Sequence, residues 1–237
     1  MPTPPLARTP GSHPDAPRAR APGPDITRWR LWQLADSAFP AGGFLHSNGL
    51  ESARQHGVIR QRDDLPRFMA TSLRQAARAS LPFVATAHRD PTSLPHCDAV
   101  CDAWTSNHVA HRASRLQGKA FARAVSHAFD LPHLASPDPG HFAPVFGAAL
   151  AHLDIPRPDA LQLFLYQHLR SVVSAAIRLN LVGPLEAQRI QQHLTAEADQ
   201  LATQAIAYTL DDLAQTAPMI DLWQGTHDRL DARLFHT

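Results

Sequence analysis

The side chains of this chain that are best suited to chemistry are those of its histidines and its two cysteines. The sequence contains 15 histidines, and His96 and Cys97 are followed one helical turn later by Cys101. On a helix the two thiols would share one face, so that both could bind a soft or borderline metal ion as thiolates. A structural zinc site normally has a second ligand pair at a defined spacing, and the sequence shows none. The pattern therefore favours the alternative, in which Cys97 and Cys101 are small buried hydrophobic residues.

The other histidines are scattered along the chain without ligand spacing. They include His108, His111, His127, His141 and His168. We expect each of them to be either a surface residue or a core residue with hydrogen-bond partners.

Motifs for nucleotide binding and hydrolysis are missing from the sequence. Neither Gly-x-x-x-x-Gly-Lys-Ser/Thr nor Gly-x-Gly-x-x-Gly occurs, and Gly-x-Ser-x-Gly and His-Glu-x-x-His are absent as well. No pair of carboxylates is placed for general acid and base catalysis. We therefore predict that the chain is not an enzyme, since an unrecognised helical active site would rest on histidine abundance alone.

The composition is that of an ordinary globular protein. Of the 237 residues, 44% are hydrophobic and 18% are charged, and the net charge of +1 does not indicate nucleic acid as a partner. No apolar run approaches the roughly 20 residues that span a bilayer, and the N-terminus lacks a signal-peptide pattern. Two cysteines are too few for a disulfide framework. We expect a cytoplasmic protein that does not associate with membranes.

The elements that must position these residues are helices. Residues 1–25 contain eight prolines and few large apolar side chains, so we predict a disordered tail. From residue 26 onward, apolar residues recur at helical spacing, and no stretch alternates as a half-buried strand would. We therefore predict an all-α, single-domain bundle of roughly eight to ten helices over residues 26–237.

Two apolar stripes are the clearest of these elements. One runs from Leu161 to Leu179 after Asp159, and the other runs from Ala187 to Tyr208. The glycine and proline at 183–184 end the first helix and begin the second. The short connection predicts an antiparallel hairpin of two helices.

The least generic stretch, residues 34–51, links two predicted helices. Pro40 and the pair Gly42 and Gly43 break the first helix, and Ser47 or Asn48 can cap the second. Two adjacent glycines permit positive φ and a close backbone approach.

The side chains of this linker allow two interpretations. Phe39, Phe44 and His46 could shape a loop that docks a partner, because they combine apolar anchors with a polar group. The alternative, which the residues alone favour, is a tight turn whose two phenylalanines fill the core.

Five motifs follow one another along the chain. They are Asp36-Ser37-Ala38-Phe39-Pro40 with Gly42-Gly43-Phe44, His46-Ser47 and Gly49-Leu50-Glu51; Ala113-Ser114-Arg115 with Gly118-Lys119-Ala120; His141-Phe142 with Val145-Phe146-Gly147; Ser174-Ala175-Ala176-Ile177-Arg178-Leu179 with Gly183 and Gln188; and Pro218, Asp221-Leu222, His227, Leu230 and Arg233-Leu234-Phe235. In this order they resemble the UreF family of urease accessory proteins over about residues 26–237.

The resemblance implies an all-α chaperone without catalytic activity that helps to deliver nickel to the urease apoprotein. Members of that family typically dimerise, bind the accessory protein UreD, also called UreH, and recruit the GTPase UreG. No cofactor is then bound permanently, and nickel is handled only transiently by the accessory complex.

The resemblance also implies partner-binding faces on the linker and on the C-terminal segment. The candidate residues are Phe39, Gly42, Gly43, His46, Ser47, Glu51, His227, Leu230, Arg233, Leu234 and Phe235. Arg233 is the best single candidate, because a guanidinium makes several directed hydrogen bonds. The alternative for Arg233 is a surface cation near a helix C-terminus.

Two departures from the family pattern qualify this inference. Arg112 stands where members commonly carry an acidic residue, and the segment from residue 90 to 101 matches no family motif. The runner-up hypothesis is a metallochaperone that holds nickel directly through His96, Cys97 and Cys101.

Overall fold

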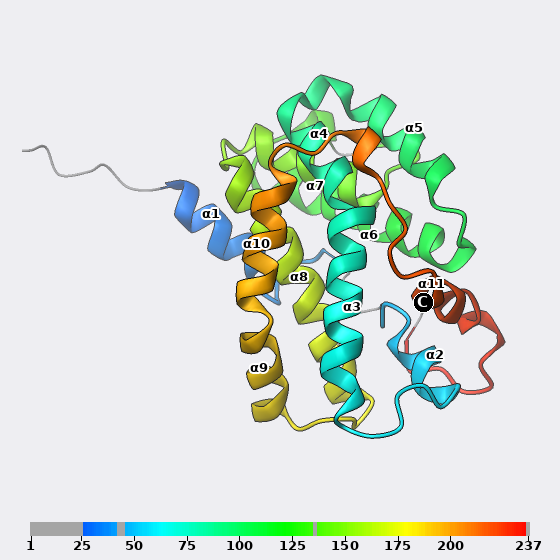
Figure 1. The fold of residues 1–237 in the computed structure, drawn as a ribbon. Coiled ribbons are helices and arrows are strands. Elements are labelled where there is room, and N and C mark those ends of the chain that lie inside the picture. The colour runs from blue at the N-terminus through cyan, green and yellow to red at the C-terminus, as the bar shows by residue number, and fades with distance from the viewer. Residues whose placement is uncertain (1–25, 42–45, 135–136, 236–237) are drawn as a thin grey trace, which may run out of the picture.

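The computed structural model describes residues 26–41, 46–134 and 137–235 (Figure 1). Within these ranges the chain forms helices and turns, and it contains no β-strand. The α-helices are α1 (Ile26–Ala35), α2 (Leu50–Gln55), α3 (Asp64–Ala79), α4 (Leu81–Arg89), α5 (Leu94–Trp104), α6 (His108–Ala128), α7 (Phe142–His152), α8 (Arg157–Arg178), α9 (Pro184–His193), α10 (Thr195–Ala205) and α11 (Pro218–Gly225). Short 3₁₀ turns lie at Pro91–Ser93, Pro132–Leu134, Leu210–Asp212 and His227–Arg229. The predicted all-α fold is confirmed.

The predicted disordered tail, residues 1–25, lies outside the described residues, and the domain boundaries stay a prediction. Among the described residues, no helix combines the length and the apolar character that crossing a membrane requires.

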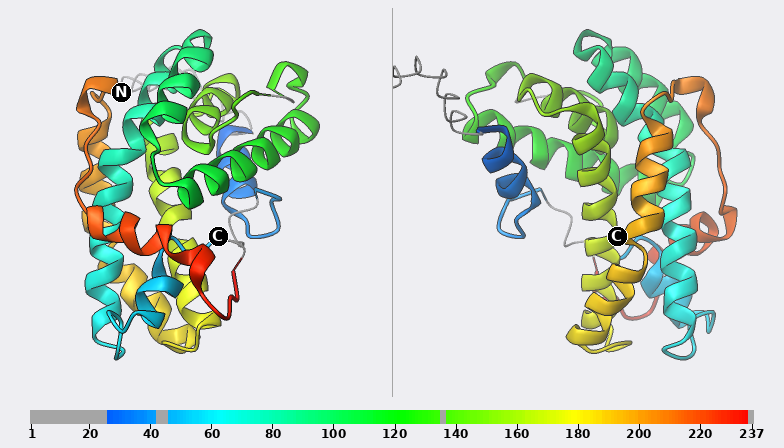
Figure 2. Two further views of the ribbon diagram at one scale, coloured as in Figure 1. Left: turned by 90° about the vertical axis from the view of Figure 1, so that its right-hand side faces the viewer. Right: turned by 60° about the vertical axis from the view of Figure 1, so that its left-hand side comes forward.

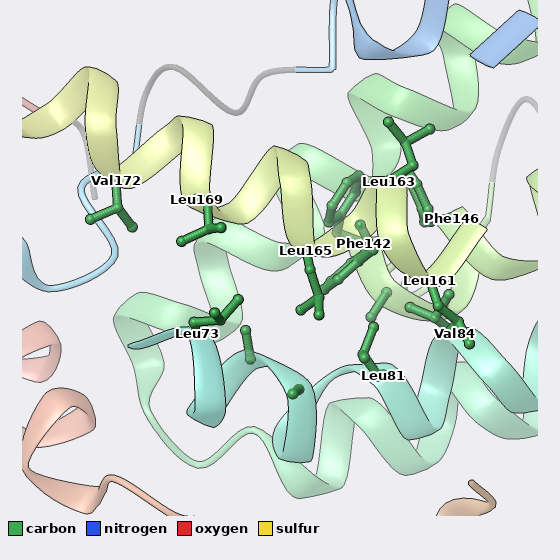
Figure 3. Close-up of a cluster of buried hydrophobic side chains, with 14 of the residues drawn as sticks. Leu73, Leu81, Val84, Phe142, Phe146, Leu161, Leu163, Leu165, Leu169 and Val172 are labelled. Carbon is green, nitrogen blue, oxygen red and sulfur yellow. The ribbon is translucent and has the colours of Figure 1, made fainter. Parts of the chain in front are cut away.

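Helix α8 is the axis of the main core. It has 22 residues and begins with a proline in its first turn. Asp159 lies in the same turn, where its negative charge interacts favourably with the helix dipole. The predicted stripe is buried from Leu161 to Ala176. Figure 3 shows Leu165 and Leu169 on the side of α8 that faces Leu73 of α3. Helices α9 and α10 pack against α8 as well, so the predicted hairpin forms.

Helix α7 lies inside the bundle, where it packs against α4 and α6. Every residue from Phe142 to Leu150 is buried, as expected for a helix that is apolar on all sides. Gly147 permits a close contact with α4, since a Cβ atom there would lie 2.4 Å from the carbonyl oxygen of Val84. Without a side chain at this position, α4 and α7 can approach each other backbone to backbone.

The helical part of the chain is interrupted at two points. The second stripe is not one helix but two, because the turn tightens at Leu194, whose N–H bonds the carbonyl of Gln191. A second break separates α5 from α6, between Trp104 and His108. There the side chain of Asn107 caps α6 by accepting hydrogen bonds from the N–H groups of Val109 and Ala110.

The linker joins α1 to α2, as predicted, but its cap differs from the expectation. The residue that precedes α2 is Gly49, with φ +82°, and neither Ser47 nor Asn48 occupies that position. A Cβ atom at Gly49 would lie 3.3 Å from the carbonyl oxygen of Ile220, so glycine serves both the backbone conformation and the packing of α11 on α2. Figure 2 shows α2 and the C-terminal segment side by side at one end of the bundle.

Candidate functional site

The chain brings the predicted loop and the predicted C-terminal segment together. Helix α2 follows the linker, and α11 and the residues after it pack along α2 (Figures 1 and 2). We call the contact of α2 with residues 226–235 the C-terminal junction. The site therefore joins residues near the two ends of the described chain.

A buried carboxylate lies at the centre of the C-terminal junction. The side chain of Glu51 is 3% exposed and receives three hydrogen-bond donors. Its Oε2 atom lies 3.0 Å from Nε2 of His227 and 3.3 Å from the backbone nitrogen of Phe235, and its Oε1 atom accepts from the backbone N–H of Leu234 at 2.6 Å. A carboxylate without such donors would be very costly to bury, so these contacts explain its position.

Further side chains of α2 and α8 hold the same segment. Gln55 donates from Nε2 to the carbonyl oxygen of Ala232 at 2.7 Å. Arg178 of α8 donates to the carbonyl oxygen of Leu234 at 3.2 Å, and its guanidinium lies 4.2 Å from the ring centre of Phe235. The ring of Phe235 is buried, so the segment is held at both its backbone and its last described side chain.

Asp228 ties the outer side of the junction to α6. It accepts two hydrogen bonds from Arg112, at 2.8 and 3.2 Å, and its Oδ1 atom lies 3.6 Å from Nη1 of Arg233. The hydrogen bond from Arg112 is the main reason why the pKa of Asp228 is lowered. Arg112, where the family pattern commonly has an acidic residue, therefore has a partner within this chain.

Burial divides the predicted partner-binding residues into two groups. His46, Ser47, Glu51, His227 and Phe235 are buried, so in the described chain their side chains do not face solvent. Arg233 and Leu234 are exposed, and Leu230 is half-buried. These three can present side chains to a partner, and the buried five can act on a partner only by fixing the shape of the segment.

One of the two phenylalanines of the linker packs inward. Phe39 lies against Phe121 and Phe129, with ring centres 6.0 and 6.3 Å apart, which agrees with the tight-turn interpretation. Gly42, Gly43 and Phe44 lie outside the described residues. The docking role of this loop stays a prediction.

Sequence reasoning missed a cavity of about 250 Å³ between the linker, α3, α6, α8 and α11. Its wall includes several polar side chains, among them Asn48, Ser72, Gln75, His168 and Ser171. Ser72 Oγ lies 2.9 Å from Nε2 of His168, and burial lowers the pKa of His168 to about 4. These residues come from the linker, α3 and α8, which lie far apart in the sequence, so no spacing in the sequence signals this cavity.

The cysteines behave as small hydrophobic residues. Cys97 and Cys101 are both buried, and burial raises the pKa of each thiol, that of Cys101 to about 12. His96, by contrast, is exposed. Over the described ranges, one group of three side chains has the ligand atoms of a metal site close together, and it is Asp102, His111 and His141. His111 and His141, which are 30 positions apart and show no ligand spacing in the sequence, therefore meet in the fold.

Comparison with known proteins identifies the family of this chain. A family model described as UreF matches residues 59–195. The chain belongs to the UreF family. Urease accessory protein F of Arabidopsis thaliana is 33% identical over 220 residues, which are 88% of this chain and 92% of that protein. The protein of the same name from Oryza sativa subsp. indica is 32% identical over 221 residues, 88% and 85% of the two chains. Urease accessory protein UreF of Granulibacter bethesdensis is 29% identical over 224 residues, 90% and 95%.

The resemblance to UreF drawn from five motifs is thus confirmed. Two of these motifs contact each other in the fold. Gly118 of α6 belongs to the second motif, and His141 and Phe142 open the third. A Cβ atom at Gly118 would lie 2.2 Å from the carbonyl oxygen of Gly140 and 2.7 Å from the backbone nitrogen of Phe142. This glycine lets α6 of the UreF-family chain contact the start of α7 directly.

Proposed function

We propose that this chain is a urease accessory protein that binds UreD/UreH and recruits the GTPase UreG while nickel is inserted into the urease apoprotein. In this role it is a cytoplasmic chaperone with no catalytic activity of its own. Family membership and the names of its relatives support the maturation role.

The C-terminal junction is the observation that carries the partner-binding part of the proposal. A terminal segment that is already fixed by Glu51, Gln55 and Arg178 loses little conformational entropy when a partner binds it. Two side chains of this segment are exposed. Arg233 offers a guanidinium, and Leu234, which is 49% exposed, offers an apolar surface. That combination suits a protein partner better than a small ligand.

Other exposed apolar side chains support additional protein contacts. Trp29 and Trp32 of α1 are 67% and 54% exposed, and Met219 and Leu222 of α11 are 52% and 61% exposed. We propose that surfaces of this kind serve the second copy of the chain in a homodimer and the GTPase.

Nickel is the cargo in this proposal and is not a resident cofactor. The polar cavity would offer oxygen and nitrogen atoms along an interior route rather than a tight cage. The alternative, storage of nickel on His96, Cys97 and Cys101, is disfavoured because thiols with raised pKa values are poor ligands at neutral pH.

The test is capture of purified UreD by the full chain and by the double variant Arg233→Ala, Leu234→Ala. We expect the variant to lose capture and to fail in a urease activation assay with the other accessory proteins, while its urea unfolding curve stays unchanged. The matched control is Leu185→Ala, which removes a 90% exposed leucine from α9 and should leave capture intact.

A second variant deletes the last ten residues, 228–237, and should lose capture while its circular dichroism stays helical. Full capture of UreD by both altered chains would overturn the assignment of the C-terminal junction. Normal urease activation in the absence of this chain would overturn the proposed function itself.

A further inference from the structure

Three side chains from separate elements converge beside the start of α7. Asp102 lies near the end of α5, His111 lies in the first turn of α6, and His141 directly precedes α7. One oxygen atom, Oδ1 of Asp102, lies 2.8 Å from Nε2 of His111 and 3.0 Å from Nε2 of His141. The two imidazole rings meet edge to face, with centres 4.8 Å apart.

The surrounding structure fixes His141 in this orientation. Its side chain is fully buried, and its Nδ1 atom lies 3.1 Å from Oγ of Ser114, which leaves Nε2 for Asp102. The backbone N–H groups of Gly140 and His141 donate to the carboxylate of the buried Asp98 at 2.6 and 2.7 Å. Ser114 therefore holds one nitrogen of the His141 ring, and Asp98 holds the backbone of the same residue. Histidines that bind metals are commonly supported in this way, by a hydrogen bond at the ring nitrogen that does not bind the metal.

The spacing of the three ligand atoms suits a transition-metal ion. A metal ion binds nitrogen and oxygen ligands at about 2.1 Å. Two ligand atoms whose bonds to the metal form a right angle then lie roughly 3 Å from each other. Both nitrogen-to-oxygen distances already have this value, and all three ligand atoms lie within 4.8 Å of one another. The side chain of His111 is 27% exposed, so it has more freedom than the buried His141 to adjust its position when an ion binds.

We propose that Asp102, His111 and His141 form a binding site for one first-row divalent transition-metal ion, such as Ni²⁺ or Zn²⁺. Two imidazoles with one carboxylate select this class of ion over Mg²⁺ and Ca²⁺, which prefer oxygen ligands alone. Asp102 is 41% exposed at its side chain, so an ion can enter from solvent and keep water in its open positions. A site with three protein ligands and open positions exchanges its ion, which is compatible with transient handling of a metal.

The competing explanation is a purely structural hydrogen-bond cluster, in which both imidazoles donate to Asp102. The deciding experiment titrates the metal-free full chain with NiCl₂ or ZnCl₂ in an isothermal calorimeter, and with CoCl₂ in an absorption spectrometer. We expect one equivalent to bind, with Co²⁺ bands that report nitrogen ligands. Asp102→Asn and His111→Ala should each weaken the affinity at least about tenfold and remove the cobalt bands.

Matched controls lie close by in the same helices. His108→Ala removes an exposed histidine of α6 that pairs with Asp228, 3.2 Å away, and Cys97→Ser tests the thiol. Both should bind as the unaltered chain does. Binding that is unchanged in Asp102→Asn and His111→Ala, or no binding tighter than that of free imidazole, would overturn the site and leave the hydrogen-bond cluster. The site does not depend on the urease role, because the titration uses the metal alone and capture of UreD can be measured on the same variants.

Discussion

The carboxylate of Glu51 and the imidazole of His227 lie 3.0 Å apart, although 176 residues separate them in the sequence. Both side chains are buried, at 3% and 1% exposure. The pair joins α2 to the turn after α11 at the point where the last residues of the described chain pass over α2. The shape of the proposed partner surface therefore depends on a contact that lies beneath it.

Glu51→Gln should destabilise the protein and loosen its C-terminal segment. The amide keeps one acceptor oxygen and replaces the other with an NH₂ group, so at least one of the three donors now at Glu51 faces another donor. Leaving a buried polar group unpaired in this way costs about 2–4 kcal/mol. Urea unfolding measures the loss, and digestion by carboxypeptidase should become faster.

The control for this substitution is Glu197→Gln. Glu197 pairs with Arg74 on the surface, where removal of one ion pair changes stability by less than about 1 kcal/mol. Equal effects of the two substitutions would show that Glu51 is not the centre of the C-terminal junction.

Gly118→Ala should be strongly destabilising even though it places a better helix former inside α6. The new Cβ atom would lie 2.2 Å from the carbonyl oxygen of Gly140, and its next neighbours are backbone atoms as well, so no side chain can move aside. The helix-propensity gain of about 1 kcal/mol is smaller than the expected clash, and we predict a net loss of about 2 kcal/mol or more.

Gly225→Ala is the matched change at the last residue of α11. The nearest atom to a Cβ there is 3.7 Å away, in the side chain of Asn107, so this variant should unfold at the same urea concentration or slightly higher. Comparison of the urea concentrations at which the two variants unfold separates the effect of close packing from the general effect of adding a methyl group.

The sequence predicts those parts of the fold that depend on local periodicity. The stripe of α8 from Leu161 to Ala176 is visible as spacing, and burial follows it. The break at Leu194 is not visible, because it comes from one tightened turn inside a continuous stripe. Local pattern therefore places helices well and their interruptions poorly.

The site depends on contacts between distant residues, which no spacing encodes. His111 and His141 are 30 positions apart and meet only because Gly118 lets α6 reach the start of α7. Glu51 and His227 were identified as motif residues, but the motif cannot show that they bond to each other and are buried. Sequence motifs therefore name candidate residues, and the packing of the helices decides what each candidate contacts.

Cys97 and Cys101 should be unreactive in the folded protein. Burial raises the pKa of both thiols, and at about 12 for Cys101 only on the order of one thiol in ten thousand is ionised at pH 8. We expect a disulfide reagent such as DTNB to label neither thiol rapidly in buffer and both thiols promptly in concentrated urea. Rapid labelling of the folded chain would mean that one cysteine is available as a ligand after all.

His168 should make stability fall as the solution is acidified. Its pKa is about 4 in the folded chain and about 6.5 when unfolded, so between these values the unfolded state binds the extra proton. The contribution is absent above pH 6.5, grows as the pH falls through this window, and reaches a loss of about 3 kcal/mol near pH 4. His168→Gln keeps a hydrogen-bonding group for Ser72 but cannot be protonated, so its free energy of unfolding should fall less between pH 7 and pH 4.5 than that of the unaltered chain. Parallel urea titrations of both proteins across this range measure the difference directly, and two curves with the same pH dependence would show that the ring is solvated and free to protonate in the folded state.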